Sequence, residues 1–388
     1  MKRRVLLVTH TPPPIVAGNG IILERLFRLF PSDSYVVLSS SHEYVDWPKD
    51  KALPCSYYTT SVPSFLGGYD WFTAIGEWIS ILPSLWSAWK ITRREKITSI
   101  LVVPSSGTLL LLSCLLSLLA RVNLSVYFLD LFSCNNHFRL RRWLSGPIER
   151  LAVARATAVF VMSEALKTHY VRRYSIDAIV LPHPIELADH GIAVRTAPSD
   201  KAGGAADVIV FTGFIYEYQL DPLQNLSAAV NKMDSVELHI YTSRSNAYLA
   251  RMGVTGKNVR YRGFIEPERI SRVQQEADIL FLPMSFRPPE PRITETASPG
   301  KLPEYLVSGT PILVHAPAYA YISWYARKHG WGVVVEQADP EALVMGIRAI
   351  LDDDGLSRRL VEKAYQTAHL HEGRMVSGVL QRAIGLVE

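Results

Sequence analysis

The stretch SPGKLPEYLVSGTPILV, residues Ser298 to Val314, predicts a loop, a short helix and a buried strand in direct succession. Its opening SPG favours a loop, Pro303 suits the first turn of a helix, and Gly309 suits the end of that helix. The closing PILV is a short apolar run that is typical of a buried strand. A helix that leads directly into a buried strand is the repeating unit of α/β folds.

Lys301 and Glu304 lie at the start of this predicted helix. A helix N-terminus offers free backbone N–H groups and a partial positive charge, and Lys301 adds a full charge, so the site suits a phosphate or diphosphate. An ionised Glu304 only accepts hydrogen bonds and could bind both hydroxyls of a sugar diol. The alternative is a solvated helix start in which Glu304 merely favours the helix dipole.

Length and composition favour two packed domains. The chain has 388 residues, of which 48% are hydrophobic, and this length exceeds the size at which one core usually keeps growing. Cys55, Cys114 and Cys134 show no metal-binding spacing and leave one cysteine unpaired in any disulfide scheme, so a reducing compartment is expected. We interpret the opening MKRRVLLVTHTPPP as a first strand and its loop, because VLLV is too short for the apolar core of a signal peptide.

Short β-rich runs alternate with helix-length apolar patterns, such as residues 20–30 and 78–92, in both halves of the chain. This alternation predicts parallel sheets with helices on both faces. The expected strands are RRVLLVTH, YVVLSS, SILVVPSS, LSVYFLDLF, TAVFVMS and AIVLPHP in the first half, and DVIVFTGF, VELHIYTS, VRYRGF, ILFLPMS, PILVHA and WGVVVEQ in the second.

Residues 187–207 separate the two halves. They are rich in alanine, glycine and small polar residues and contain no long apolar run, so they are predicted to form a linker between domains at 1–186 and 208–373. Doubly wound sheets bind ligands at the carboxyl ends of their strands, which directs the search for functional residues to the loops after those strands.

The order of segments around SPGKLPEYLVSGTPILV resembles the C-terminal domain of GT-B glycosyltransferases, especially the retaining glycosyltransferase family 4 type. The resemblance rests on KLPEYLVSGTPI, on ADILFLPMSF and VRYRGFIEPERI before it, and on GWGVVVEQADPEALVMGIRAILDD after it. In the first half, ERLAVARATAVFVMSEALKTHYVRRY and IVLPHPIE resemble the segment that precedes the family's linker. The resemblance implies an α/β GT-B fold: two Rossmann-like doubly wound parallel-sheet domains facing a cleft, with a C-terminal helix at 374–388 packing back on the first domain.

The activity implied by the resemblance is that of a glycosyltransferase of the hexosyltransferase type. Domain 1–186 would bind the acceptor, and domain 208–373 would bind a nucleoside-diphosphate sugar as donor. No cofactor and no metal are expected, because GT-B enzymes of this type need no bound metal. The resemblance also implies that the configuration of the transferred sugar is retained.

The loop HTPPPIVAGNG, which follows the first predicted strand, resembles the glycine loop that lies beside donor and acceptor in the family. Gly18 and Gly20 would let backbone N–H groups approach a phosphate or sugar closely, with His10 and Asn19 beside them. A glycine pair before a helix is also compatible with a plain turn.

Asp130 follows LSVYFL at the place where the family commonly shows a His-Asp pair, and Leu129 replaces the histidine. Asp130 is therefore a candidate catalytic residue. A single aspartate at the end of a strand is equally compatible with a helix cap.

The segment FTGFIYEYQLDP corresponds to the family's donor loop, and Gly213 in it would allow close approach of the backbone. Family members usually hold the diphosphate with an arginine and a lysine there, whereas this chain has aromatic residues, Glu217 and Gln219. The cations left for the diphosphate are Lys301 and any of Arg244, Arg287 and Arg292, each of which could equally be a solvated loop residue.

The family's Glu-x7-Glu pattern is incomplete in this chain. Glu304 matches its second member, which binds ribose, whereas Thr296 occupies the first position and Glu295 stands beside it. A one-residue bulge would bring Glu295 to the site. The candidate catalytic residues are Glu295, Lys301 and Asp130, and the candidate donor-binding residues are Gly213, Phe214, Arg244, Phe264, Ser298, Gly300, Lys301, Leu302 and Glu304.

The apolar run from Thr108 to Val122 falls short of the roughly 20 residues that cross a bilayer, so a helix buried against a sheet is expected. Basic clusters and tryptophans near this run, together with a net charge of +5, favour peripheral contact with an anionic membrane. No nucleic-acid-binding signature is present.

The expected acceptor is a lipid-linked or envelope glycan, with a soluble acceptor as the alternative. The expected compartment is the cytoplasm, at the inner face of the plasma membrane if this contact forms. The basic and aromatic residues are Lys90, Arg93, Arg94, Lys96, Arg139, Arg141, Arg142, Trp71, Trp78, Trp86, Trp89 and Trp143.

Three rival functions remain open at this stage. A nucleotide-sugar epimerase would share the fold, and a catalytically silent nucleotide-binding or scaffold protein would explain the missing donor-loop cations. A Rossmann dehydrogenase is disfavoured, because PPPIVAGNG rather than a GxGxxG motif follows the first strand.

Overall fold

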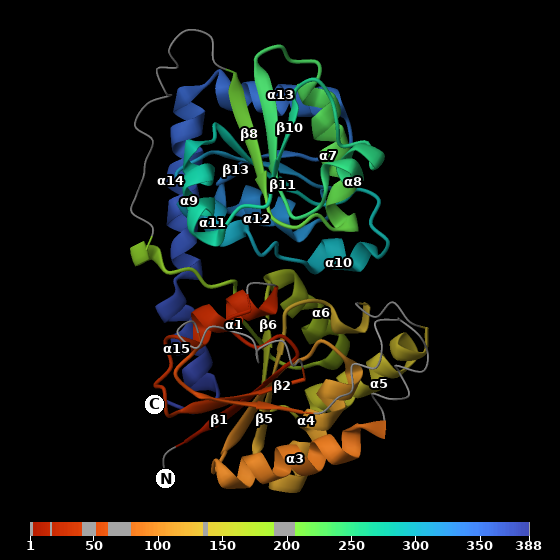
Figure 1. Ribbon diagram of the computed structural model, residues 1–388, viewed down its shortest axis with the longest axis vertical. Helices are drawn as coiled ribbons and strands as arrows, with labels where there is room; N and C mark the ends of the chain where they lie inside the picture. The colour runs from red at the N-terminus through yellow and green to blue at the C-terminus, as the bar shows by residue number, and fades with distance from the viewer. Residues whose placement is uncertain are drawn as a thin grey trace. The chain divides into compact units, whose positions relative to one another are not determined.

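The structure is a computed structural model that describes residues 3–15, 18–40, 52–60, 79–134, 139–189 and 206–387, the side chains of 139–143 excepted. The chain divides into two compact units (Figure 1). The first unit consists of Met1–Pro184 and Gly373–Glu388, and the second of Ile185–Glu372. Of the predicted linker at 187–207, residues 190–205 lie outside the described residues, and Leu187–Asp189 form a 3-10 turn.

The first unit is built on a sheet in which all described strands are parallel, in the order β3-β2-β1-β4-β5-β6-β7. All six strands expected from the sequence are present. The short strand β3 was missed, because its SYYT sequence carries no buried apolar run. The strands are β1 (Val5–Thr9), β2 (Tyr35–Ser39), β3 (Ser56–Thr59), β4 (Ser99–Val103), β5 (Asn123–Phe128), β6 (Ala158–Val161) and β7 (Ala178–Val180).

Helices cover both faces of this sheet. One face packs on α1 and α15 through Leu23, Phe27 and Leu380, and the other packs mainly on α3, α4 and α5 through residues such as Leu110 and Ala152. Because both faces are covered, strands β1, β2 and β4 are buried along their whole length. The helices are α1 (Asn19–Phe27), α3 (Ile81–Arg94), α4 (Gly107–Ala120), α5 (Arg139–Arg155), α6 (Glu164–Tyr174) and α15 (Gly373–Ala383).

The second unit repeats this architecture with a parallel sheet in the order β10-β9-β8-β11-β12-β13. Each strand matches one of the six expected runs. The strands are β8 (Asp207–Thr212), β9 (Val236–Tyr241), β10 (Val259–Gly263), β11 (Ile279–Pro283), β12 (Ile312–His315) and β13 (Gly332–Val335).

The core on one face of this sheet is formed with α7, α8 and α13, through residues such as Leu226, Leu249 and Ile347. In Figure 1, α9 and α11 lie on the other side of the sheet from α7 and α8. The helices are α7 (Glu217–Val230), α8 (Asn246–Arg251), α9 (Pro267–Glu276), α10 (Pro291–Thr296), α11 (Leu302–Val307), α12 (Tyr321–His329), α13 (Pro340–Leu351) and α14 (Asp354–Ala368).

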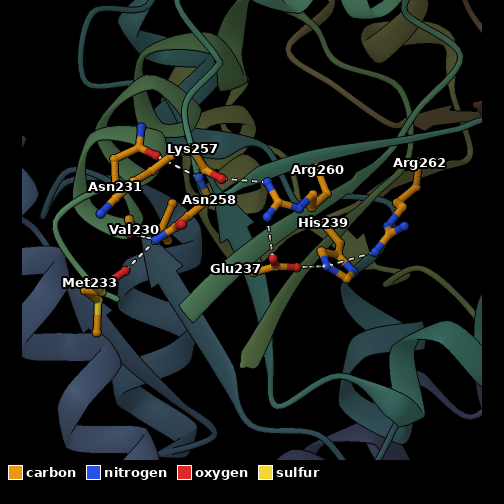
Figure 2. A network of polar contacts seen from close by, with 9 residues as sticks. All are labelled: Val230, Asn231, Met233, Glu237, His239, Lys257, Asn258, Arg260 and Arg262. Carbon is orange, nitrogen blue, oxygen red and sulfur yellow. Dashed lines mark hydrogen bonds and ion pairs between the residues drawn. The ribbon is translucent and has the colours of Figure 1, made fainter. Parts of the chain in front are cut away.

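A polar network anchors the edge strand β10 (Figure 2). The side chain of Asn258 donates a hydrogen bond of 2.8 Å to the carbonyl of Val230 at the end of α7. Arg260 on β10 donates to Glu237 on β9 at 2.6 Å, and Glu237 also contacts His239 at 2.9 Å. These bonds hold β10, which is the edge strand of this sheet among the described residues.

The C-terminal helix returns the chain to the first unit (Figure 1). Helix α15 packs on α1, where Ser377 Oγ donates a 3.2 Å hydrogen bond to Leu26 O. The helix expected at 374–388 extends from Gly373 to Ala383, and its residues Val376 and Leu380, one turn apart, are both buried in the core.

The longest apolar run forms α4, which packs between the sheet and its neighbours α3 and α5. It begins at a Ser106 cap, whose hydroxyl accepts a hydrogen bond from the backbone N–H of Leu109 at 3.2 Å. Among the described residues, no helix has the length and apolar character that crossing a membrane requires.

Candidate active site at the carboxyl ends of the second sheet

Lys301 lies against the end of strand β8 in the second unit. Its Nζ stands 3.6 Å from the centroid of the Phe211 ring, and a Cβ placed on Gly213 would lie 3.6 Å from the same atom. Gly213 has a φ of 112°, a backbone conformation that side chains rarely allow. The fold therefore brings together two residues that lie far apart in the sequence, Gly213 and Lys301.

The ammonium group of Lys301 is buried, and within the described part of the chain it has no hydrogen-bond partner. Burial lowers the pKa of this lysine to about 7, although the nearby carboxylate of Glu304 acts to raise it. Burying a charge without a partner is unfavourable, so such a group is suited to an anion supplied by a ligand.

A buried hydrogen-bond network supports the helix that follows Lys301. The hydroxyl of Tyr305 on α11 accepts from the backbone N–H of Thr212 at 3.3 Å. The side chain of Gln274 on α9 donates to Thr212 Oγ1 at 3.2 Å, and Thr310 Oγ1 donates to Gln274 O at 2.7 Å. These bonds connect strand β8, helix α9 and helix α11 to one another next to Lys301. Sequence reasoning missed Gln274 and Thr212, because a polar residue in a strand or helix does not reveal its partner.

The loop after β8 carries exposed aromatic rings, and Arg244 is bound to it. The guanidinium of Arg244 lies 4.2 Å from the ring of Phe214 and 4.7 Å from that of Tyr248, and its Nε donates to Ile215 O at 3.2 Å. Arg244 therefore connects the donor loop, through Phe214 and Ile215, to Tyr248 on α8. Phe214 is 40% exposed and Phe264, which follows β10, is 63% exposed.

Some backbone N–H groups at the site already donate hydrogen bonds to other backbone carbonyls. The N–H of Gly213 donates to Tyr241 O at 2.9 Å, and the N–H of Leu302 donates to Pro299 O at 3.0 Å. Leu302 points its side chain into the core, whereas Gly300 is exposed and Ser298 is half-buried. Gly213 thus contributes space beside Lys301, and its N–H is not free for a ligand.

The segment that holds the first position of the incomplete glutamate pair forms the short helix α10. Glu295 is exposed on this helix, whereas Thr296 is buried and donates its hydroxyl to Arg292 O at 2.8 Å. The chain is helical through both residues, without the bulge that would exchange them. Arg292 is engaged with Glu290 through hydrogen bonds of 2.9 Å and 3.0 Å.

In the first unit, the glycine loop connects β1 to α1. A Cβ on Gly20 would lie 2.2 Å from the carbonyl oxygen of Ile15, so the loop closes only because this residue is glycine. Gly18 has a φ of 45° and open space around it, and Asn19 begins α1. His10 is exposed and its Nδ1 lies 2.8 Å from Ser40 Oγ. Asp130 is exposed and follows β5.

His315 at the end of β12 is a buried residue that the sequence reasoning did not select. Its Nε2 lies 3.2 Å from the side-chain amide of Asn225 and its Nδ1 lies 3.0 Å from Val335 O. Burial lowers the pKa of His315 to about 4, so the ring is neutral at physiological pH. The imidazole joins β12, β13 and α7 as a neutral structural group.

A separate cavity of about 260 Å³ in the first unit lies at the amino ends of strands β4 and β5. It is lined by Ser99, Asn123 and Gly385 among others. Ligands of doubly wound sheets bind at the opposite, carboxyl ends of the strands, so this cavity is not part of the candidate site.

Comparisons with known proteins agree with the two-sheet fold described above. Residues 206–353 match the family model for glycosyl transferases group 1. A search of curated protein sequences found no match. A sucrose-phosphate synthase from Thermosynechococcus elongatus has a similar structure over 98% of this chain and 98% of its own, with 14% identity and a TM-score of 0.72.

Two further solved structures have a similar fold. The HepE protein of Anabaena, solved in complex with UDP, is similar over 99% of this chain and 100% of its own, with 15% identity and a TM-score of 0.71. A putative UDP-N-acetylglucosamine 2-epimerase from Listeria monocytogenes is similar over 98% and 96%, with 14% identity and a TM-score of 0.61. At these identities the solved structures establish the fold. The chain therefore has the GT-B fold, and the match of its residues 206–353 to the glycosyl transferases group 1 model supports a glycosyltransferase.

Proposed function

We propose that this glycosyltransferase takes a hexose from a nucleoside-diphosphate sugar and transfers it to a glycan acceptor, with the donor bound on the second unit. The observation that carries the proposal is the buried ammonium group of Lys301, which has no hydrogen-bond partner among the described residues and lies beside Gly213. A diphosphate placed there would supply the hydrogen-bond acceptors that this ammonium group lacks.

The mechanism follows from where charge develops. When the bond between the sugar and the diphosphate breaks, negative charge grows on the leaving phosphate. A cation held in place beforehand, in a site with little water, stabilises that charge without reorganisation. Lys301 takes this role in the proposal, and Glu304, one turn further along α11, accepts hydrogen bonds from the ribose hydroxyls.

The aromatic rings at the same edge of the sheet suit the base of the nucleotide. Phe214 follows β8 and Phe264 follows β10, two strands separated by β9, and both expose rings on which a base can stack. HepE was solved with UDP and with UDP-glucose, so uridine nucleotides are the first ligands to test. In this proposal Arg244 contributes by holding the ring of Phe214 in place.

The remaining parts of the proposal come from the family resemblance. Transfer proceeds without a bound metal and with retention of configuration, and Glu295 and Asp130 are the carboxylates to be tested for roles in catalysis. The glycine loop with His10, Gly18, Asn19 and Gly20 contacts the acceptor. The acceptor is a lipid-linked or envelope glycan of polysaccharide synthesis, reached from the cytoplasmic face of the membrane.

Thermal stabilisation by nucleoside diphosphates and their sugars tests the donor site. A ligand at 100 times its dissociation constant is expected to raise the free energy of unfolding by about 2.7 kcal/mol. Lys301→Ala is expected to abolish most of this stabilisation and to lower turnover by about 100-fold. Lys328→Ala is a matched control, because its ammonium also stands over an aromatic ring, at 4.5 Å from Trp324, but is exposed. Full activity of a folded Lys301→Ala variant would contradict the diphosphate assignment.

Two other functions are distinguished by the same assays. An epimerase, suggested by the likeness to the Listeria structure, would convert a nucleotide sugar with no acceptor present. A silent binding protein, suggested by the lack of a cation at Phe214, Tyr216 and Glu217, would be stabilised by nucleotide but would transfer no sugar to any acceptor. The family match of residues 206–353 favours the transferase over both.

A further inference from the structure

Helix α3 exposes an apolar stripe on the side that faces away from the sheet. Leu82 is 74% exposed and Trp86 is 56% exposed, and Ile79, which is 71% exposed, lies just before the N-cap residue Ser80. Leu82 and Trp86 share one face, because residues four apart are neighbours on a helix surface. The opposite face packs into the core and consists of Ile81, Ser84, Ala88, Ile91 and Thr92. The stripe thus plays no part in the core of its own unit.

Cations lie directly on the aromatic part of this stripe. The rings of Trp86 and Trp89 are stacked with centroids 5.1 Å apart. The ammonium of Lys90 lies 4.9 Å from the Trp86 ring, and the guanidinium of Arg93 lies 5.7 Å from the Trp89 ring. Tryptophan beside lysine and arginine is the composition that proteins place at the boundary between lipid chains and headgroups.

A cavity of about 560 Å³ opens beside the stripe, between β3 and α3. Two cations, Lys90 and Arg94, face it together with hydroxyl-bearing side chains. Glu95 is engaged by Arg4 at 2.6 Å and also lies 3.9 Å from the guanidinium of Arg94, so part of the charge of Arg94 is balanced by its own neighbour. Lys90 has no ion pair within the described ranges, so its charge is available to an outside anion. The lining residues are Tyr57, Tyr58, Thr59, Ser87, Lys90, Ile91 and Arg94.

We propose that these residues form a docking surface for an anionic lipid bilayer, here called the α3 face: Ile79, Leu82, Trp86, Trp89, Lys90, Arg93 and Arg94. Leu82 and Trp86 enter the headgroup boundary of the bilayer. Lys90 and Arg94 bind the phosphate of a lipid headgroup in the adjoining cavity. The proposal does not depend on the donor site, which lies in the other unit.

The positive charge of the α3 face favours binding to an anionic bilayer over binding to a second copy of the chain. A symmetric dimer through this face would bring Lys90, Arg93 and Arg94 of one copy near the same cations of the other, and like charges repel. An anionic bilayer instead offers a negative surface to every cation on the face at once.

Vesicle flotation with the full chain tests the proposal. The protein is expected to float with vesicles of phosphatidylcholine and phosphatidylglycerol at low salt, and to remain unbound with phosphatidylcholine alone or at high salt. Lys90→Gln with Arg94→Gln should weaken binding by about fivefold for each charge removed. Leu82→Gln with Trp86→Ser should weaken binding at both salt concentrations, because it removes apolar contact that salt does not screen.

Matched controls lie in the second unit. Met345→Gln removes an apolar residue that is 73% exposed on α13, and Arg358→Gln with Lys363→Gln removes two exposed charges from α14. Neither control is expected to change flotation. Thermal unfolding of every variant checks the fold, and an unchanged shift with nucleotide shows that the donor site is intact.

Two results would overturn the proposal. The first is wild-type protein that does not float with anionic vesicles at low salt, or α3-face variants that float like the controls. The second is a wild-type dimer in sedimentation that the Leu82→Gln, Trp86→Ser variant converts to a monomer without lipid, since a second copy would then cover the face. Loss of nucleotide stabilisation with intact flotation would count against the donor site alone.

Discussion

At the scale of single residues, Lys301 shows how a ligand site can oppose stability. Its ammonium is buried against the Phe211 ring and has no hydrogen-bond partner among the residues the structure describes. In the unfolded chain this lysine keeps its proton up to a pH near 10.5, whereas in the folded chain it loses the proton above about 7. Between these pH values the unfolded state binds more protons, so the free energy of unfolding contributed by Lys301 rises with pH.

Lys301→Met is therefore expected to stabilise the protein while it weakens nucleotide binding. The apolar side chain keeps the contact with Phe211 without a buried charge, and such replacements stabilise by about 1–4 kcal/mol. The gain over wild type should be larger at pH 6, where Lys301 is charged, than at pH 9, where it is neutral. Urea unfolding at both pH values measures it, with the exposed Lys328→Met as control. A variant less stable than wild type at pH 6 would contradict the buried, unpaired state of Lys301.

The affinity for nucleoside diphosphate is expected to depend on pH through the same group. A diphosphate binds the charged lysine, so above pH 7 the free protein must take up a proton on binding. Affinity should then fall by up to about tenfold for each pH unit above 7, until the raised pKa of the bound state is reached. Calorimetry in buffers of different ionisation enthalpy measures the proton uptake. Lys301→Met should show none, and equal uptake by both proteins would place the titrating group elsewhere.

At the scale of elements, the glycine loop between β1 and α1 depends on the two glycines for different reasons. Gly20 lies so close to Ile15 that a Cβ would meet its carbonyl oxygen at 2.2 Å. Gly18 has open space around it but a positive φ of 45°. A backbone contact of this kind forces the loop to move, whereas the conformation of Gly18, with φ 45° and ψ −113°, is unfavourable for other residues by about 1–3 kcal/mol without any clash.

Gly20→Ala is accordingly expected to destabilise the protein more than Gly18→Ala, by about 1–3 kcal/mol of additional free energy of unfolding. Thermal and urea unfolding of the two variants form a matched pair in one loop. Equal losses would contradict the prediction, because the crowding of position 20 against Ile15 would then carry no additional cost. Since the loop lies in the first unit, stabilisation by donor nucleotide is expected to be unchanged in both variants.

Helices and strands with strong apolar patterns could be predicted from the sequence. Those whose formation depends on contacts with residues far away in the sequence could not. Strands such as β1, β4 and β11 are buried along their whole length, and each was expected from its unbroken run of apolar residues. Strand β3 and helix α10 were missed, because the first is half-exposed and the second is six residues long. Short elements of this kind are stabilised by what they pack against, which their own residues do not encode.

At the scale of the whole molecule, the first unit is completed by the end of the chain. Helix α15 adds Val376, Leu380 and Ile384 to the core that also contains Leu23 and Phe27. The second unit therefore stands, in sequence, between two parts of the first. Long-range contacts of this kind couple the stability of the first unit to residues that follow the second.

Leu380→Ala is expected to lower the free energy of unfolding by about 2–5 kcal/mol, because it removes a fully buried side chain and leaves a cavity. Met375→Ala on the same helix is the control, since Met375 is 46% exposed and should change stability little. Denaturant unfolding with and without nucleotide measures both. The loss should appear in the transition that nucleotide does not shift, and a loss confined to the nucleotide-sensitive transition would contradict the assignment of α15 to the first unit.

The amino-acid sequence by itself determined the class of the fold, the two parallel sheets and the position of Lys301 and Glu304 at the start of a helix. These features follow from periodicity, glycine and proline positions and short-range order, which are local properties of the chain. Only the tertiary structure decided that Lys301 is buried against Phe211 beside Gly213, that Arg244 stacks on Phe214, and that α15 completes the first unit. Each of these depends on which distant segments pack together, and burial and pKa change only once that packing has removed water.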